Sequence, residues 1–235
     1  MKPVRICSLV LILSTVLLFS CKKEHAPVTS PASYDYVPVN TGHWVVYDVD
    51  SIVHADNDNN TDDSVRYFHF QIKEVISSTF IDGEGRPVQR IERYHKQANS
   101  DEWNITNVWT TTVTSNRVER VEDNIRYVAL AFPINSTISW NRNSFNTLGE
   151  DYDTYNSFHE PIELGSFSFD STLSVVQLDA ESNDNYVEKI YFEEKYAVHV
   201  GRIYKVYQDL LKNAGQVVSG LDYTETVADY GNQPL

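Results

Sequence analysis

The sequence predicts an all-β protein that folds as a single curved antiparallel sheet or barrel with little helix. Apolar residues recur with a period of two, and turn-forming residues separate the alternating runs. No segment carries a long apolar stripe with the 3.6-residue period of a helix. Because helical segments do not separate the strands, we do not expect a parallel α/β sheet. About ten strands fit the spacing that sandwiches and barrels show.

The predicted strands each place apolar residues on one face and polar residues on the other. The clearest is the segment 103–113, in which Asn and Thr occupy most of the second face. Its apolar face carries Trp103, Ile105, Trp109 and Val113. Shorter runs contain Val45, Tyr47 and Val49; Phe68, Phe70 and Ile72; Ile190 and Phe192; and Leu221, Tyr223 and Val227.

Turn chemistry predicts where these strands end. Residues 82–85 and 213–215 contain the Asp-Gly and Asn-Ala-Gly patterns of hairpin connections, and 57–60 is a longer polar loop. The segment 141–160 alternates weakly and predicts an irregular insertion. A turn or two of helix is predicted in 206–212. Together these elements predict a sheet curled to protect its edges, as in a lipocalin-like or LolA-like half-barrel.

The N-terminus has the features of an export signal. Lys2 and Arg5 precede an apolar run over residues 9–19, which has about half of the ~20 residues needed to span a bilayer. A short apolar run behind a basic start is typical of a secretory signal that is removed from the mature protein.

The end of the signal contains Leu18-Phe19-Ser20-Cys21, which resembles the bacterial lipobox. This resemblance implies lipid on the Cys21 sulfur and cleavage just before that residue. The resulting organisation is a signal peptide over 1–20, a lipidated cysteine with a flexible tether over 21–33, and a single β domain over 34–235. The other cysteine, Cys7, is lost with the signal, so the mature chain has no disulfide.

The composition excludes one class of partner. Hydrophobic residues make up 41% of the chain and aromatic residues 12%, which is enough for a packed core. The 19 basic residues are outnumbered by 33 acidic ones, and the net charge is −14. Phosphate groups repel so acidic a chain, so nucleic acid is excluded as a partner.

Two short motifs resemble those of a known group of proteins. Gly42, Trp44 and Tyr47 form a Gly-x-Trp-x-x-Tyr pattern in the first predicted strand, and residues 200–205 read Val-Gly-Arg-Ile-Tyr-Lys. Both motifs are similar to those of uncharacterised envelope lipoproteins of Bacteroidetes-type bacteria. The resemblance implies an outer-membrane lipoprotein in the cell envelope, on the periplasmic or the surface-exposed face. It supplies no catalytic residue.

The usual catalytic motifs are missing from the sequence. It has no Gly-x-Ser-x-Gly elbow, the mature chain keeps no free thiol, and the seven histidines show no metal-binding spacing. We therefore predict neither a catalytic residue nor a cofactor. The Asp-rich segment around Asp56, Asp58 and Asp62 is a weak candidate for a cation site, but Thr61 and Tyr67 replace the Gly and Glu that an EF-hand loop requires.

Aromatic and acidic residues leave three functional interpretations open. The leading one is a non-enzymatic binding or assembly module, held on the membrane by its lipid anchor, that recognises a glycan, an apolar ligand or an envelope protein. The second is a carrier of a lipid or other apolar ligand in a β cup, and the third a carboxylate-dependent glycan hydrolase. Candidate ligand-binding residues are Trp44, Trp103, Trp109 and Trp140, and candidate carboxylate pairs are Glu150 with Asp153 and Glu193 with Glu194.

Overall fold

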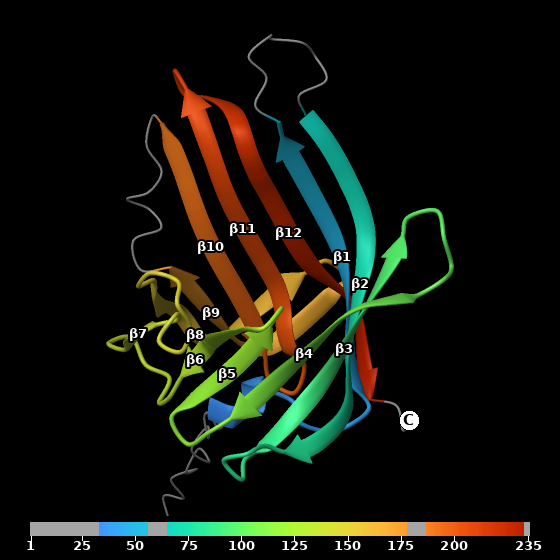
Figure 1. Cartoon of the computed structure of the whole chain (residues 1–235), viewed down its shortest axis with the longest axis vertical. Helices are drawn as coiled ribbons and strands as arrows, with labels where there is room; N and C mark the ends of the chain where they lie inside the picture. The colour runs from blue at the N-terminus through green and yellow to red at the C-terminus, as the bar shows by residue number, and fades with distance from the viewer. Residues whose placement is uncertain (1–32, 56–64, 178–186, 233–235) are drawn as a thin grey trace, which may run out of the picture. The chain divides into compact units, whose positions relative to one another are not determined.

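The computed structural model describes residues 33–55, 65–177 and 187–232, which form one twelve-stranded antiparallel sheet (Figure 1). The predicted all-β curved sheet or barrel is therefore confirmed. A short 3₁₀ turn, η2 (Ser33–Tyr36), precedes the strands. The strands are β1 (His43–His54), β2 (Val65–Ile81), β3 (Pro87–Gln97), β4 (Asn104–Val113), β5 (Arg117–Glu122), β6 (Ile125–Ala131), β7 (Ser139–Asn141), β8 (Tyr152–Leu164), β9 (Phe167–Gln177), β10 (Glu188–Ala197), β11 (Gly201–Asn213) and β12 (Gln216–Asn232).

Some of the sequence predictions lie outside the described residues. These are the signal, Cys21, nearly all of the tether, and the cation candidates Asp56, Asp58 and Asp62. They stay predictions.

The sheet follows the chain as two meanders joined by its first and last strands. The strand order is β6-β5-β4-β3-β2-β1-β12-β11-β10-β9-β8-β7. The β1–β12 pairing runs from His43 opposite Asn232 to His54 opposite Gly220. Every neighbouring pair in this order is adjacent in sequence except β1 and β12, so the antiparallel connections are short. The two edge strands, β6 and β7, are also consecutive in the chain.

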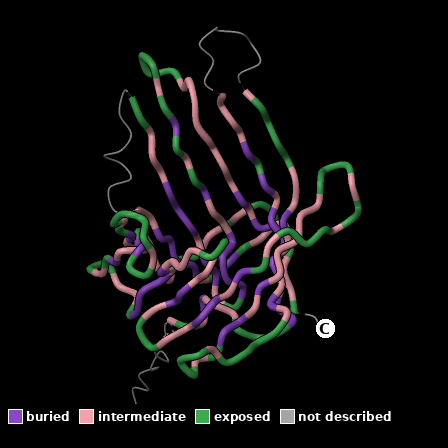
Figure 2. The backbone as a smooth tube through the Cα atoms, in the orientation of Figure 1, coloured by how far each residue is buried: buried purple, intermediate pink, exposed green. Residues whose placement is uncertain are grey.

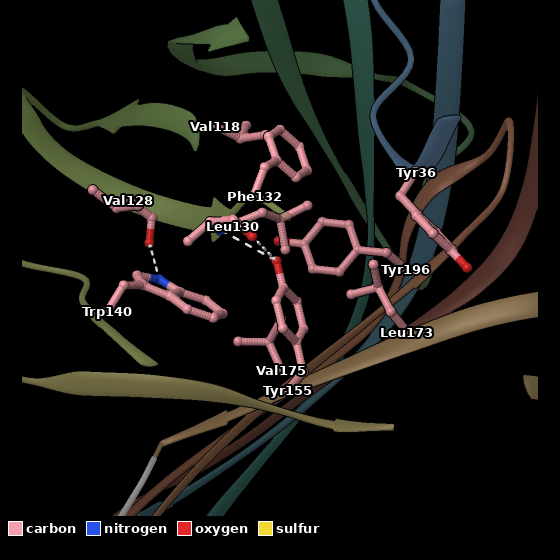
Figure 3. Close-up of a cluster of buried hydrophobic side chains, with 11 residues drawn as sticks. Tyr36, Val118, Val128, Leu130, Phe132, Trp140, Tyr155, Leu173, Val175 and Tyr196 are labelled. Carbon is pink, nitrogen blue, oxygen red and sulfur yellow. Dashed lines mark hydrogen bonds between the residues drawn. The ribbon is translucent and has the colours of Figure 1, made fainter. Parts of the chain in front are cut away.

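The two edges meet at a seam that nearly closes the sheet. The Val128 backbone N–H donates to the Arg142 carbonyl oxygen at 2.8 Å, and the Trp140 indole N–H donates to the Val128 carbonyl oxygen at 3.0 Å (Figure 3). The Tyr155 hydroxyl donates to the Ala131 carbonyl oxygen at 2.6 Å. Side chains thus satisfy edge backbone groups that would otherwise remain unpaired.

A buried aromatic cluster fills the interior behind the seam. Trp140 and Tyr155 pack there with Leu130, Leu173 and Tyr196 (Figure 3). Tyr36 of η2 joins the same cluster and is fully buried, and its hydroxyl lies 2.8 Å from His159 Nδ1 and 2.9 Å from Ser171 Oγ. The segment that enters the domain is therefore held in the core by a buried aromatic ring with a satisfied hydroxyl.

Burial is uneven along the long strands. Strands β10, β11, β12, β1 and β2 run side by side, and their upper parts are mostly exposed or half-buried (Figures 1 and 2). The lower parts of β1, β10 and β11 are mostly buried, and those of β2 and β12 are less so (Figure 2). The upper parts therefore present a sheet face that side chains of other strands cover only in part.

Local predictions are confirmed at the turns and corrected in two segments. The hairpins at 82–85 and 213–215 connect β2 to β3 and β11 to β12. The helix predicted in 206–212 is wrong, because this segment lies in β11 and pairs with strands on both sides. The irregular insertion predicted over 141–160 is too long, since 152–160 belongs to β8 and pairs with β9. In both segments sheet pairing outweighs the local pattern.

Gly220 occupies a position that only glycine fits. Its φ is +122°, and an added Cβ would lie 2.0 Å from the Asp209 carbonyl oxygen and 2.9 Å from the Leu210 Cα. We expect Gly220→Ala to cost about 1–3 kcal/mol through backbone clash and strain. Thermal unfolding followed by circular dichroism would show a melting temperature several degrees lower. Gly149→Ala is the control, because a Cβ there meets nothing within 4 Å; equal melting temperatures for the two variants would contradict the assignment.

Candidate functional site

Five adjacent strands carry aligned rows of side chains on one face. Directly paired residues of antiparallel strands project to the same side of a sheet. Following the register across β10, β11, β12, β1 and β2 gives an aromatic-rich row of Phe192, Tyr207, Tyr223, Ser51 and Phe68. The next row on this face consists of Glu194, Lys205, Glu225, Val49 and Phe70.

An open pocket of about 480 Å³ lies against this face, and we call it the aromatic pocket. One wall comes from β10 to β12 and the other from β3, β4, β5, β6 and the segment that follows β7. The wall from β10 to β12 consists of Phe192, Lys205, Tyr207, Leu221, Tyr223 and Glu225, and the opposite wall of Arg93, Trp109, Glu122, Tyr127, Arg142, Asn143, Leu148 and Asp151.

Beneath the pocket, arginine and glutamate side chains form a buried charge network, defined as Glu74, Arg93, Arg120, Glu194, Arg202 and Glu225. Arg202 is its centre, and only 2% of its side chain is exposed. Its guanidinium lies 2.6 Å from Glu225, 3.0 Å from Glu194 and 3.2 Å from Glu74. Each carboxylate comes from a different strand, so one cation joins β2, β10 and β12 across the interior.

The other members complete the pairing of the three carboxylates. Arg120 donates to both oxygens of Glu74 at 2.7 and 2.8 Å. Arg93 donates to Glu225, and its Nε lies 3.4 Å from Glu74. Buried charges are tolerated when they are paired and hydrogen-bonded in this way.

The network fixes the ionisation of its glutamates. Burial raises the pKa of Glu74, but Arg120, Arg202 and Arg93 outweigh burial and lower it to about 2. Burial likewise opposes ionisation of Glu194, and Arg202 and Lys205 lower its pKa to about 2. Both groups are therefore charged at neutral pH and hold no proton to give to a substrate.

The candidate carboxylate pairs do not form acid–base pairs. Glu193 accepts a hydrogen bond from Ser174 at 2.7 Å, whereas Glu194 is bound by Arg202, so the two neighbours have separate surroundings. Glu150 is exposed and Asp153 is fully buried. Neither pair presents two carboxyl groups to one cavity of the described domain.

Of the four candidate tryptophans, Trp109 alone lines the aromatic pocket. Its ring is already in contact with cations of the fold, since the Arg93 guanidinium lies 4.3 Å and the Arg120 guanidinium 5.1 Å from the ring centroid. Trp109 therefore helps to hold two arginines of the network in place.

The remaining tryptophans are not brought together with it. Lys73 lies 4.9 Å from the centroid of Trp44, and Lys96 lies 4.9 Å from that of Trp103. Trp140 is buried in the seam cluster. A ligand role for any of the four stays a prediction.

Sequence reasoning missed Arg142, which projects into the pocket from the segment after β7. Its guanidinium lies 4.0 Å from the ring centroid of Phe192 and 5.5 Å from that of Tyr127. The nearest carboxylate is Asp153, with 3.9 Å between Arg142 Nε and Asp153 Oδ2. Burial raises the pKa of Asp153 to about 8, and the attraction of Arg142 offsets this only in part. No local pattern marks Arg142, because its aromatic neighbours come from other strands.

Two features are absent from the described residues. Over residues 33–55, 65–177 and 187–232, no group of three or more His, Cys, Asp and Glu side chains is arranged to hold a metal ion. The same ranges contain no helix long and apolar enough to cross a membrane.

Comparison with known proteins gives one similar structure. No family model and no curated protein matches the sequence. A solved structure from Bacteroides fragilis, described as a "putative exported protein with YmcC-like fold", has a TM-score of 0.44 and 7% sequence identity, and the match covers 83% of this chain and 98% of that chain.

Replacing Arg202 tests the role of the network in stability. Arg202→Met leaves Glu74, Glu194 and Glu225 buried without their shared cation, and loss of one partner from such a group costs about 3–5 kcal/mol. The urea midpoint of unfolding at pH 7 is expected to fall sharply. Arg66→Met is the control, because Arg66 is exposed.

The pH dependence of the same variant gives a second readout. In the wild type the pKa of Glu74 and Glu194 falls from 4.5 to about 2 on folding. The stability that they contribute is therefore present above pH 4.5 and is lost as the pH falls towards 2. In Arg202→Met their pKa values rise, so acidification over this range should destabilise the variant less. An unchanged acid profile would contradict this role of Arg202.

Proposed function

We propose that this chain is a lipid-anchored protein of the bacterial cell envelope that binds a small molecule in the aromatic pocket without transforming it. The observation that carries the binding proposal is the open pocket of about 480 Å³, with aromatic walls above a fixed charged floor. Pockets that combine apolar walls with a few placed polar groups are typical of small-molecule sites. The envelope location rests on the signal and the lipobox that ends at Cys21.

The state of the charged groups favours binding over catalysis. Glu74, Glu194 and Glu225 are held by arginines and are ionised at neutral pH. Acid–base hydrolysis of a glycan needs a carboxyl group that keeps its proton near the scissile bond. Asp153 has the raised pKa that such a role requires, but it is fully buried and is not part of the pocket lining.

The interior also favours a compact ligand over a lipid. The charge network lies across the interior, and the space directly on its far side, between Tyr36, Val45 and Arg202, measures about 70 Å³. A more open pocket of about 780 Å³ shares Pro38 and His43 with this space. Acyl chains need continuous apolar space, and a floor that contains Arg93 and Glu225 interrupts it. The polar and aromatic walls instead suit a ring that stacks on tyrosine and phenylalanine.

The anchor is tested by replacing Cys21. Cys21→Ser removes the sulfur that would carry the lipid, so the protein should leave the membrane fraction and its intact mass should lack the acyl groups. Cys7→Ser is the matched control, because Cys7 lies in the segment that is removed. A Cys21→Ser protein that remains in the membrane fraction with unchanged mass would show that the anchor is elsewhere.

The pocket is tested with two exposed tyrosines of the same sheet region. Tyr207 lines the aromatic pocket, whereas Tyr67 is 76% exposed and is not part of its lining. Full-length protein in detergent is screened by thermal shift against neutral and charged monosaccharides and small phenols at millimolar concentration. Tyr207→Ala should abolish the stabilisation seen with the wild type, and Tyr67→Ala should retain it. Stabilisation that survives in Tyr207→Ala would place binding outside this pocket.

A further inference from the structure

Arg142 is held rigidly by its backbone at the edge of the aromatic pocket. Its N–H donates to the Asp151 carbonyl oxygen at 2.8 Å, and its carbonyl oxygen accepts from the Val128 N–H at 2.8 Å. The second bond belongs to the seam between the two sheet edges. The position of Arg142 is therefore set by closure of the sheet and does not depend on a ligand.

The Arg142 side chain is stacked on aromatic rings. Phe192 and Tyr127 contact the guanidinium. Within the described domain the Arg142 Nε is buried without a partner, as are the Nε atoms of Arg93, Arg120 and Arg202. When aromatic rings cover the face of a guanidinium, the N–H groups at its edge remain available to bind both oxygens of a carboxylate. Arg142 lines the open pocket, so a carboxylate that enters the pocket can reach its N–H groups.

The carboxylate nearest to Arg142 lies beyond hydrogen-bond distance. Asp153 Oδ2 is 3.9 Å from Arg142 Nε, and burial raises the pKa of Asp153 to about 8. Asp151 accepts a hydrogen bond from Gln177 at 2.9 Å, and Glu122 lies 2.7 Å from Arg120. Arg202, by contrast, contacts three carboxylates.

Lys205 supplies a second loosely paired cation in the same pocket. Its Nζ lies 3.9 Å from Glu194 Oε1, beyond hydrogen-bond distance, and Glu194 is already bound by Arg202 and by the Tyr196 hydroxyl. The same Nζ lies 5.9 Å from the ring centroid of Phe192, the ring on which Arg142 stacks. Two cations thus share one aromatic ring at the pocket wall.

Resting on the function proposed above, we infer that Arg142 and Lys205 form an anion subsite and that the ligand is a ring bearing a carboxylate. Tyr207 lies opposite Phe192 and Tyr223 lies opposite Tyr207, and both tyrosines line the pocket and supply the surface for the ring. Asp151, Glu122 and Glu225 also line the pocket and limit the negative charge that it tolerates. A monoanionic carboxylate therefore fits better than a dianionic phosphate.

Isothermal titration calorimetry on the full-length protein tests this inference with paired probes. The acids are glucuronate and 4-hydroxybenzoate, their neutral counterparts are glucose and 4-hydroxybenzyl alcohol, and phenyl phosphate is the dianion. We expect at least one acid to bind about tenfold or more tightly than its neutral counterpart and than phenyl phosphate. The acid that binds identifies the ring as a sugar or an arene.

Variants of Arg142 and Lys205 test whether these two side chains form the anion subsite. Arg142→Gln should weaken binding of the acid about tenfold or more and leave binding of the neutral ring unchanged, and Lys205→Met should weaken it by a smaller factor. Arg126→Gln is the matched control, because Arg126 pairs with Glu119 and is not part of the pocket lining. If the melting temperature of Arg142→Gln is too low for titration, Arg142→Lys and Lys205→Met are used instead. Arg142→Lys should bind the acid more weakly than the wild type, because the point charge of lysine replaces the bidentate guanidinium.

The outcomes separate this inference from the function on which it rests. Neutral rings that bind as tightly as the acids, with affinity lost in Tyr207→Ala, would leave the pocket assignment intact and overturn the anion subsite. Acid binding that is unaffected by Arg142→Gln and Lys205→Met would overturn it as well. Absence of binding for every ring compound would overturn both proposals.

Discussion

One cation in the interior, Arg202, is the contact on which the rest of the domain depends. It lies on β11 and binds carboxylates from β2, β10 and β12, and so connects the two meanders of the sheet across the interior. The apolar core is divided into three clusters, and the largest of them lies at the seam. Since an unpaired buried carboxylate is far more costly than a paired one, Arg202 stabilises the packing of these strands in this register.

The network also determines what kind of site the domain can offer. A sheet that closes around apolar side chains can enclose a deep cavity for a lipid, but here arginines and glutamates occupy the middle of the interior and leave an open pocket above them. Trp109 contributes to the floor by packing against Arg93 and Arg120. The ion pairs of the network thus hold the charged surface rigid, and a rigid site loses less entropy when a ligand binds.

Sequence periodicity predicts the strands well because each strand is half-buried, and Asp-Gly and Asn-Ala-Gly patterns predict the hairpins that join them. It does not predict the network, since Arg202 and Glu74 are 128 residues apart in the sequence and no local pattern relates them. Arg202 lies inside the motif 200–205, but nothing in that motif marks its side chain as buried. Arg142 was missed for a similar reason, because it follows a three-residue strand in a segment predicted to be irregular and gains its neighbours only when the sheet edges meet.

The charge network separates the point where the chain enters the domain from the aromatic pocket. The chain enters the domain at η2, where Tyr36 is buried and lines the small space on the far side of the network from the aromatic pocket. Figure 1 shows η2 at the opposite end of the sheet from the upper parts of β10 to β12. The chain therefore enters the domain at the end of the sheet away from the aromatic pocket. For the charged ring proposed above as the ligand, approach from water is favoured over approach through an apolar layer, because moving a carboxylate through such a layer is costly.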